Sequence, residues 1–268
     1  MKKKIVLVVG ALAIVIIACQ KVPITGRKQM SLISESEMIG MSLTSYAEFL
    51  SKNPAVAETD ANAKMVSRIG VNMQKAVEKF MADKGLSSRL EGYQWEFHMV
   101  NENTVNAWCM PGGKVVVYSG LLPVTQTEAG LACVMGHEIA HAVARHGNER
   151  MSQGLLVQAG GAALSVALSQ KPQLTQNLFL QSYGVTSQLG MLKYSRTHES
   201  EADKMGLVFM AIAGYDPSEA IAFWERMEQA SGGNKPPEIL STHPSDATRI
   251  ADIKAFLPEA MKYYKIYR

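Results

Sequence analysis

The stretch His137-Glu138-Ile139-Ala140-His141 constrains this chain more than any other part of its sequence. It lies in a run whose apolar residues recur at helical spacing, so the two histidines, four positions apart, share one face of a helix. Two imidazoles on one face can bind one zinc ion. Glu138, about 100° round the helix, can reach a zinc-bound water without being a ligand. The stretch therefore predicts a zinc site with Glu138 as general base.

The helix that carries this stretch is expected to be buried. It is predicted to begin at Thr125, where Glu128 three residues later completes a capping box, and to end at Gly147. Most of its other residues are apolar or small. Because unpaired histidine and glutamate are costly to bury, a metal site is favoured over a purely structural role for the two histidines.

The N-terminal residues predict export from the cytoplasm. Residues 1–18 have a basic start and then an apolar run that is too short to span a bilayer, which is typical of a secretory signal peptide. Cys19 follows Ala18, an arrangement that resembles the lipobox of bacterial lipoproteins, in which the cysteine is acylated. The alternative is an ordinary signal with an incidental cysteine. Gln20 resembles the residue that follows the lipidated cysteine in outer-membrane lipoproteins. We therefore expect a bacterial cell-envelope protein on the periplasmic side of the outer membrane, attached to the membrane through Cys19.

The charge balance excludes one class of partner. Subtracting Lys2, Lys3 and Lys4 from the 27 basic residues leaves 24, which matches the 24 acidic residues. A balanced mature chain gives no electrostatic reason to expect nucleic acid. We divide the chain into the signal peptide at 1–18, a lipid anchor and tether at 19–33, and one compact domain at 34–268.

Cys109 and Cys133 are the cysteines that remain if Cys19 carries lipid. One disulfide between them is possible in an oxidising compartment. Free, buried cysteines are favoured, because a buried free cysteine behaves as a small hydrophobic residue.

The rest of the chain predicts helices and a small sheet. Helices are expected from Ser34, where Glu37 completes a capping box, from about Asp60 to Asp83, and from Asp216. Alternating apolar and polar residues predict strands at 93–99 and 114–118, next to a tight turn at 111–113. His98 lies on the polar face of its strand, so it is expected at the surface. An edge of this sheet is suited to pair with an extended peptide.

Residues 151–192 form a second largely apolar region. Its apolar runs are too short to cross a membrane, so a helical hairpin packed on the core is favoured. A cover over the site, or a contact with a membrane or partner, is the alternative.

A third zinc ligand is expected from the stretch around residues 195–203. His198, Glu199, Glu201 and Asp203 compete for this role. Glu199 and Asp203 are four apart on one helical face, so Glu199 can bind zinc while Asp203 accepts a hydrogen bond from a ligand imidazole. Glu201 lies on another face, and we expect it to be a solvated charge.

Several motifs together resemble one known family. H-E-x-x-H is followed by S-R-x-x-E-x-E-A-D, and the chain also contains P-I-T-G-R at 23–27, N-A-W at 106–108, P-G-G at 111–113 and S-T-H-P at 241–244. This set resembles the zinc metallopeptidases of peptidase family M48, which contains HtpX, the CAAX prenyl proteases and the BepA-type lipoproteins. The resemblance covers nearly the whole chain after the signal peptide. It fits the lipid-anchored branch, but without several membrane spans or tetratricopeptide repeats.

The resemblance implies an α+β fold, mostly α-helical and of the zincin type, with a small sheet beside the active-site helix. It implies one Zn²⁺ per chain, with Glu199 as the ligand after His137 and His141. It also implies that His243 faces the metal, either to stabilise an oxyanion or to fill the open zinc position at rest. Asn106 is a second candidate donor, and Arg249 is expected to brace the loop that carries His243.

The expected function is that of a zinc-dependent endopeptidase. Its expected substrates are unfolded or misassembled cell-envelope proteins. One alternative is a periplasmic chaperone or assembly factor with a latent protease site, and another is a structural lipoprotein that binds no metal. The sequence leaves the oligomeric state and the cleavage specificity open.

Overall fold

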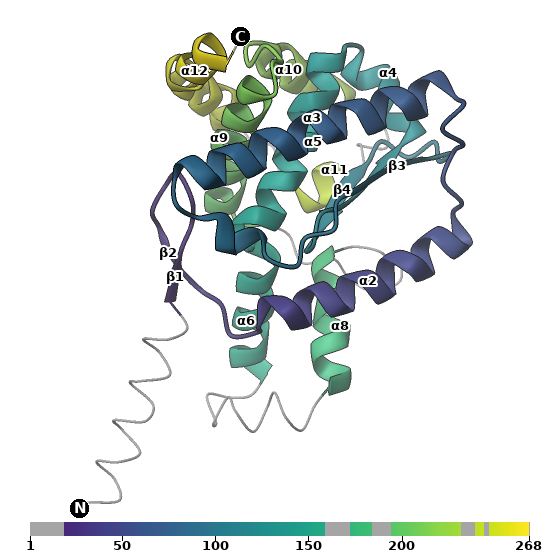
Figure 1. Cartoon of the computed structure of the whole chain (residues 1–268), viewed down its shortest axis with the longest axis vertical. Helices are drawn as coiled ribbons and strands as arrows, with labels where there is room; N and C mark the ends of the chain where they lie inside the picture. Colours follow the sequence, from purple (N-terminus) through teal and green to yellow (C-terminus); the bar gives the residue numbers. More distant parts are fainter. Residues whose placement is uncertain (1–18, 159–171, 184–193, 232–238, 244–246, 268) are drawn as a thin grey trace, which may run out of the picture.

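The computed structural model describes residues 19–158, 172–183, 194–231, 239–243 and 247–267. Helices dominate this part of the chain and enclose a small mixed sheet, which confirms the predicted α+β class (Figure 1). The predicted signal peptide lies outside the described residues. Within them, no helix combines the length and the apolar character that crossing a membrane requires.

The elements follow one another along the chain as β1 (Cys19–Lys21), β2 (Lys28–Met30), α2 (Glu35–Lys52), α3 (Ala61–Asp83), η1 (Ser87–Leu90), β3 (Glu96–Val100), β4 (Ala107–Met110), β5 (Lys114–Tyr118), η2 (Ser119–Leu121), α4 (Leu122–Thr125), α5 (Glu128–Ala144), α6 (His146–Gln158), α8 (Pro172–Tyr183), α9 (Arg196–Ile212), α10 (Glu219–Ser231), α11 (Ile239–Thr242) and α12 (Ala247–Tyr267).

The main sheet has the strand order β3-β5-β4. β3 pairs with β5 in parallel, and β4 pairs with β5 antiparallel, so β4 is an edge strand. The turn between β4 and β5 is the one predicted at Pro111, and it requires glycine, because Gly112 and Gly113 have φ angles of 87° and 82°. The sequence predicted β5 correctly but did not delimit β4.

Alternation along the strands sends side chains into two helical layers. Phe97, Val115 and Val117 join the core formed with α3, α5 and α9. Val116 and Trp108 join a second cluster on the other face, with residues of α2, α6 and α8. Figure 1 accordingly shows the sheet between α3 and α2.

α5 and α9 approach each other closely at two glycines. A Cβ built on Gly136 would lie 3.0 Å from the carbonyl oxygen of Gly206, and one on Gly206 would lie 2.9 Å from the amide nitrogen of His137. Both values are shorter than ordinary van der Waals contacts of a methyl group. Only glycine at both positions therefore allows this approach, which brings the H-E-x-x-H helix against the helix that carries Glu199.

The ends of α5 differ from the prediction. The N-cap is Thr127, whose side chain accepts a hydrogen bond from the amide of Gly130. Thr125 instead ends α4, and Gln126, with a φ of 60°, interrupts the helical conformation between α4 and α5. α5 ends before Arg145, which takes a left-handed φ of 62°. Gly147 lies inside the next helix, where a Cβ would collide with the ring of Tyr183.

Other predicted elements are found where the sequence placed them. Ser34 and Asp60 are the N-caps of α2 and α3. Near Asp216, a turn precedes α10, which begins at Glu219. Cys109 and Cys133 are free and buried, as favoured.

Two segments add to the sequence-based picture. Residues 19–30, expected to be part of a tether, form a two-stranded hairpin. Its strands have three residues each, which is too few to show periodicity. α6 and α8 pack together within the region 151–192, but residues 159–171 and 184–192 of that region lie outside the described part of the chain.

The contact between α5 and α9 makes a testable prediction. We expect Gly206→Ala to lower the free energy of unfolding by about 1–3 kcal/mol, because the added methyl group overpacks the contact. Gly40→Ala is the matched control, since Gly40 also lies within a helix and a Cβ there meets nothing within 4 Å. That control should be neutral or stabilising by up to about 1 kcal/mol. Urea unfolding in the presence of a chelator measures both, and equal effects would contradict the packing argument.

Candidate metal centre

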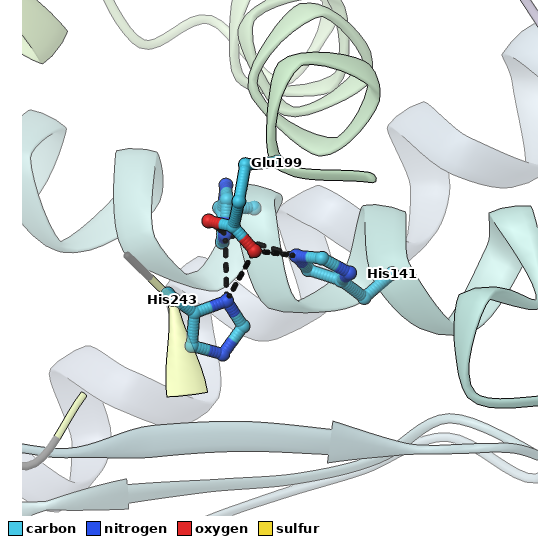
Figure 2. Close-up of side chains that lie close together, drawn as sticks. His141, Glu199 and His243 are labelled. Carbon is cyan, nitrogen blue, oxygen red and sulfur yellow. Dashed lines mark hydrogen bonds and ion pairs between the residues drawn. The ribbon is translucent and has the colours of Figure 1, made fainter. Parts of the chain in front are cut away.

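Three separate helical segments bring four candidate ligand side chains together. His137 and His141 come from α5, Glu199 from the first turn of α9, and His243 follows α11. One ligand atom from each lies within 4.8 Å of all the others, and all four residues are buried. Figure 2 shows His141, Glu199 and His243 pointing toward one another.

The separations between these atoms fit zinc. His137 Nε2 lies 3.1 Å from His141 Nε2 and 3.2 Å from His243 Nδ1. Glu199 Oε1 lies 3.4 Å from His141 Nε2 and 3.1 Å from His243 Nδ1. In a tetrahedral site with Zn–N bonds of about 2.0–2.1 Å, neighbouring ligand atoms are about 3.3 Å apart. The donor set is therefore of the size and chemistry that zinc requires.

The outer nitrogen of His137 is held by a carboxylate. Its Nδ1 lies 2.8 Å from Oδ1 of Asp203, so Nδ1–H donates outward and the lone pair of Nε2 faces the other ligands. Asp203 was predicted in this role. Arg249 holds Asp203 in turn, with Nε 2.8 Å and Nη2 2.7 Å from its two oxygens.

Arg249 was predicted to brace the loop that carries His243, and its described ion pairs are with Asp203 and Glu199. Its Nη1 lies 3.0 Å from Oε2 of Glu199, so one guanidinium compensates two buried carboxylates. The guanidinium carbon also lies 3.4 Å from the ring centroid of Trp224, which covers the group on its other side.

The outer nitrogen of His141 is held by a second imidazole. Nδ1 of His146 lies 3.0 Å from Nδ1 of His141, and Nε2 of His146 lies 3.2 Å from Oε2 of Glu201. The ring of Tyr194 packs against His141, with 3.8 Å between centroids. Glu201 is therefore buried and bonded, and the prediction that it is a solvated charge was wrong.

Glu138 lies next to the four ligand side chains with one oxygen unpaired. Its Oε1 is buried, has no hydrogen-bond partner among the described residues, and lies 3.5 Å from Nε2 of His243. Burial raises the pKa of Glu138, and the nearby His243 and His137 offset this only in part. A carboxylate with an elevated pKa is suited to take and return a proton.

The electrostatics favour the metal-binding protonation states at Glu199 and His141, whereas at His137 the effect of burial is outweighed by Asp203 and Glu199, which raise its pKa to about 9. Burial opposes ionisation of Glu199, yet His243, His137 and His141 hold its pKa well below its usual range. Burial is also the main reason that the pKa of His141 lies well below its ordinary value. An ionised carboxylate and a neutral imidazole are the forms that coordinate zinc.

The contacts described for the other candidate residues do not involve the four candidate ligand atoms. Asn106 directly precedes β4, and its Oδ1 accepts a hydrogen bond from the amide of Ala107. His98 stacks on Tyr46 of α2. His198 contacts Glu149 of α6, with 3.0 Å between Nε2 and Oε2, instead of joining the ligand group.

His146 and Tyr194 are contacts of the ligands that the sequence analysis missed. His146 follows His141 by five positions, which is not a same-face helical spacing, and Arg145 breaks the helix between them. Tyr194 directly precedes the cap of α9. Its position beside the S-R-x-x-E motif is the one signal in the sequence that pointed to it.

Comparisons with known proteins agree with this geometry. The sequence model of peptidase family M48 matches residues 70–257. The chain is 35% identical over 242 residues to "Mitochondrial metalloendopeptidase OMA1" of Schizosaccharomyces pombe, an alignment that covers 89% of this chain and 66% of that protein. It is 32% identical over 248 residues to human "Metalloendopeptidase OMA1, mitochondrial", covering 90% of this chain and 46% of the relative.

A bacterial protein is also similar. The "Beta-barrel assembly-enhancing protease" of Escherichia coli K12 is 33% identical over 165 residues, which cover 60% of this chain and 34% of that protein. The chain thus spans between about a third and two thirds of the length of the three relatives described.

The ligand geometry predicts different effects for different substitutions. His137→Ala or Glu199→Ala should weaken zinc binding more than His243→Ala does, because each removes one of the three predicted zinc ligands, whereas His243 lies at the position that a catalytic zinc leaves open. His243→Ala should retain zinc, since three protein ligands remain. Metal analysis of the purified chain after gel filtration measures this. Full zinc content in Glu199→Ala would mean that another residue is the third ligand.

Proposed function

Because the chain belongs to peptidase family M48, we propose that it is a zinc-dependent endopeptidase that hydrolyses peptide bonds within proteins. The observation that carries the proposal is the buried group of His137, His141, Glu199 and His243, with the unpaired carboxylate oxygen of Glu138 beside it. In this proposal, His137, His141 and Glu199 are the zinc ligands.

The chain's own residues divide the remaining work. Zinc, when bound, supplies a Lewis acid that polarises the scissile carbonyl. Glu138 takes a proton from the attacking water and passes it to the leaving amine, which accounts for a carboxylate left unpaired in a buried place. Asp203 and Arg249 hold the ligands in position. Asn106 remains a candidate donor to the developing negative charge.

The substrate is proposed to bind in an extended form. β4 is an edge strand that packs against α5, and the residue before Asn106, Val105, accepts a hydrogen bond from the amide of Ile239 at the start of α11. A peptide that adds to a strand edge is recognised mainly through its backbone. This mode favours unfolded protein segments over any one folded partner.

We further propose that the substrates are unfolded or misassembled envelope proteins and that the chain acts from the periplasmic side of the outer membrane, anchored by lipid on Cys19. The basic and apolar start of the sequence supports this location. Two of the similar proteins are named as mitochondrial, so the location needs its own test. Incorporation of labelled palmitate that is lost in Cys19→Ala, with the protein recovered in outer-membrane fractions, would support it. Unlabelled, freely soluble protein would contradict it.

A second candidate function is an assembly factor or chaperone with a latent protease site. The position of His243 favours it, because a fourth protein ligand fills the place that a catalytic zinc leaves open. In this proposal, the arrangement described here is a resting state. Binding of unfolded protein would then survive Glu138→Gln.

The first test pairs metal content with cleavage. We expect about one zinc per chain both in the parent and in Glu138→Gln, and cleavage of casein by the parent alone, because the substitution removes the base and leaves the ligands. Zinc in both without cleavage in either would favour the latent assembly factor. Absence of zinc from both would contradict the metal site itself.

The second test concerns His243. If His243 fills the open position at rest, His243→Ala should retain zinc and cleave casein faster than the parent. The double variant with Glu138→Gln is the control, and it should be inactive. A fall in cleavage of about 10²- to 10³-fold would instead assign His243 to stabilisation of the oxyanion.

A further inference from the structure

Arg27 connects the N-terminal hairpin (residues 19–30) to α6 and to α9, the helix that carries Glu199. Nη1 and Nη2 of Arg27 lie 2.8 Å and 2.7 Å from the two oxygens of Glu149 on α6. Nε of Arg27 lies 2.9 Å and 3.0 Å from the two oxygens of Glu201 on α9. Thr25 adds a hydrogen bond of 2.7 Å to Glu201. The hairpin therefore holds a carboxylate that lies two residues from the ligand Glu199.

The turn of the hairpin, which precedes Arg27, contains one residue with an unfavourable backbone conformation. Ile24 has a φ of 66°, which is unfavourable for a β-branched residue. The amide of Thr25 donates to the carbonyl of Pro23, with 2.7 Å between the atoms, which closes a tight γ-turn. Strain of this kind persists only where the surrounding structure fixes it. Here the turn directs Thr25 and Arg27 onto the same carboxylate.

Two hydrogen bonds connect Glu201 to His141 through His146. An ionised carboxylate only accepts, so Nε2 of His146 must carry the proton that it donates to Glu201. Nδ1 of His146 lies 3.0 Å from Nδ1 of His141, so only one of these two nitrogens carries the proton between them. A His141 that binds metal through Nε2 carries its proton on Nδ1, so Nδ1 of His141 is the donor and Nδ1 of His146 is the acceptor. The lone pair of His141 is left on Nε2, which is the nitrogen that faces the other ligands.

We propose that His146 is a positioning residue for the zinc ligand His141, and that the N-terminal hairpin fixes it by holding Glu201 through Arg27 and Thr25. This rests on the proposed zinc site. Asp203 positions His137 in the same way, by a direct hydrogen bond to its Nδ1. The two ligands of the H-E-x-x-H helix thus depend on opposite ends of the sequence, since Arg249 holds Asp203 and Arg27 holds Glu201.

A second carboxylate and imidazole, Glu149 and His198, resemble the pair of Glu201 and His146 but have no described contact with His141. Glu149, like Glu201, bonds to Arg27 and to one imidazole, that of His198. The ring of His198 stacks on His146, 4.6 Å away between centroids, but the hydrogen bond described for it leads to Glu149 and not to a ligand. A substitution of Glu149 therefore disturbs the same network without breaking the connection to His141.

The test measures zinc affinity in the full chain by competition with a chromophoric chelator. His146→Leu should weaken zinc binding by about 10- to 100-fold, as loss of a partner of a ligand histidine generally does. His146→Asn should recover part of this loss, because its amide oxygen lies near the position of Nδ1 and can accept from His141. Glu201→Gln should also weaken binding, whereas Glu149→Gln should change it by less than about twofold.

The contribution of the hairpin has its own pair of variants. Arg27→Gln should weaken zinc binding in the same direction as Glu201→Gln. Arg68→Gln should not, although Arg68 makes a bidentate pair with Glu128 at the start of α5. In the cobalt-substituted protein, the visible absorption bands should shift for Arg27→Gln and remain as in the parent for Arg68→Gln, since these bands report the geometry around the metal.

Each outcome separates this proposal from the proposed function. Zinc bound by the parent with the same affinity in His146→Leu would overturn the positioning role and leave the zinc site standing. Absence of zinc from the parent would overturn both. Equal weakening by Glu201→Gln and Glu149→Gln would also overturn the proposal, because it would reveal a general loss of structure. If His146→Leu does not fold, the Glu201 and Glu149 variants decide.

Discussion

The close backbone contact between α5 and α9 at Gly136 and Gly206 is the constraint on which the centre depends. Glu199, Asp203 and Gly206 are separated by four and three positions, so they share one face of α9. Because Gly206 lies against α5, the carboxylates of Glu199 and Asp203 on this face reach the imidazole of His137, which follows Gly136. A larger residue at either glycine would push α5 and α9 apart and so move the side chains of one helix away from those of the other.

Sequence reasoning worked where the relevant residues lie on one continuous helix. His137 and His141 were placed by their spacing of four, and the same spacing paired Glu199 with Asp203. It also located β3, β5 and the starts of α2 and α3, whose caps and alternation are local signals. In each of these cases, the periodicity of one element was enough.

Sequence reasoning failed for side chains whose burial depends on other elements that pack over them. Glu201 lies off the ligand face of α9 and was expected in solvent, but the hairpin and α6 cover that side of the helix. His146 lies beyond the break at Arg145, so helical spacing does not relate it to His141. The four-residue β4 and the three-residue strands of the hairpin are too short to show a period. These features arise from tertiary contacts and carry no local signal.

The position of Arg249 has a consequence for the order in which the molecule becomes functional. Synthesis proceeds from the N-terminus, so both histidines of α5 and the two carboxylates of α9 are made long before the cation that compensates those carboxylates. Until Arg249 arrives, Asp203 and Glu199 lack the guanidinium that compensates both of them, and histidines are the partners that remain beside them. The interior of the centre is therefore expected to close only after Arg249 has been synthesised. In a polypeptide that is still being made, this cation is missing, and the two carboxylates are favoured to remain in water.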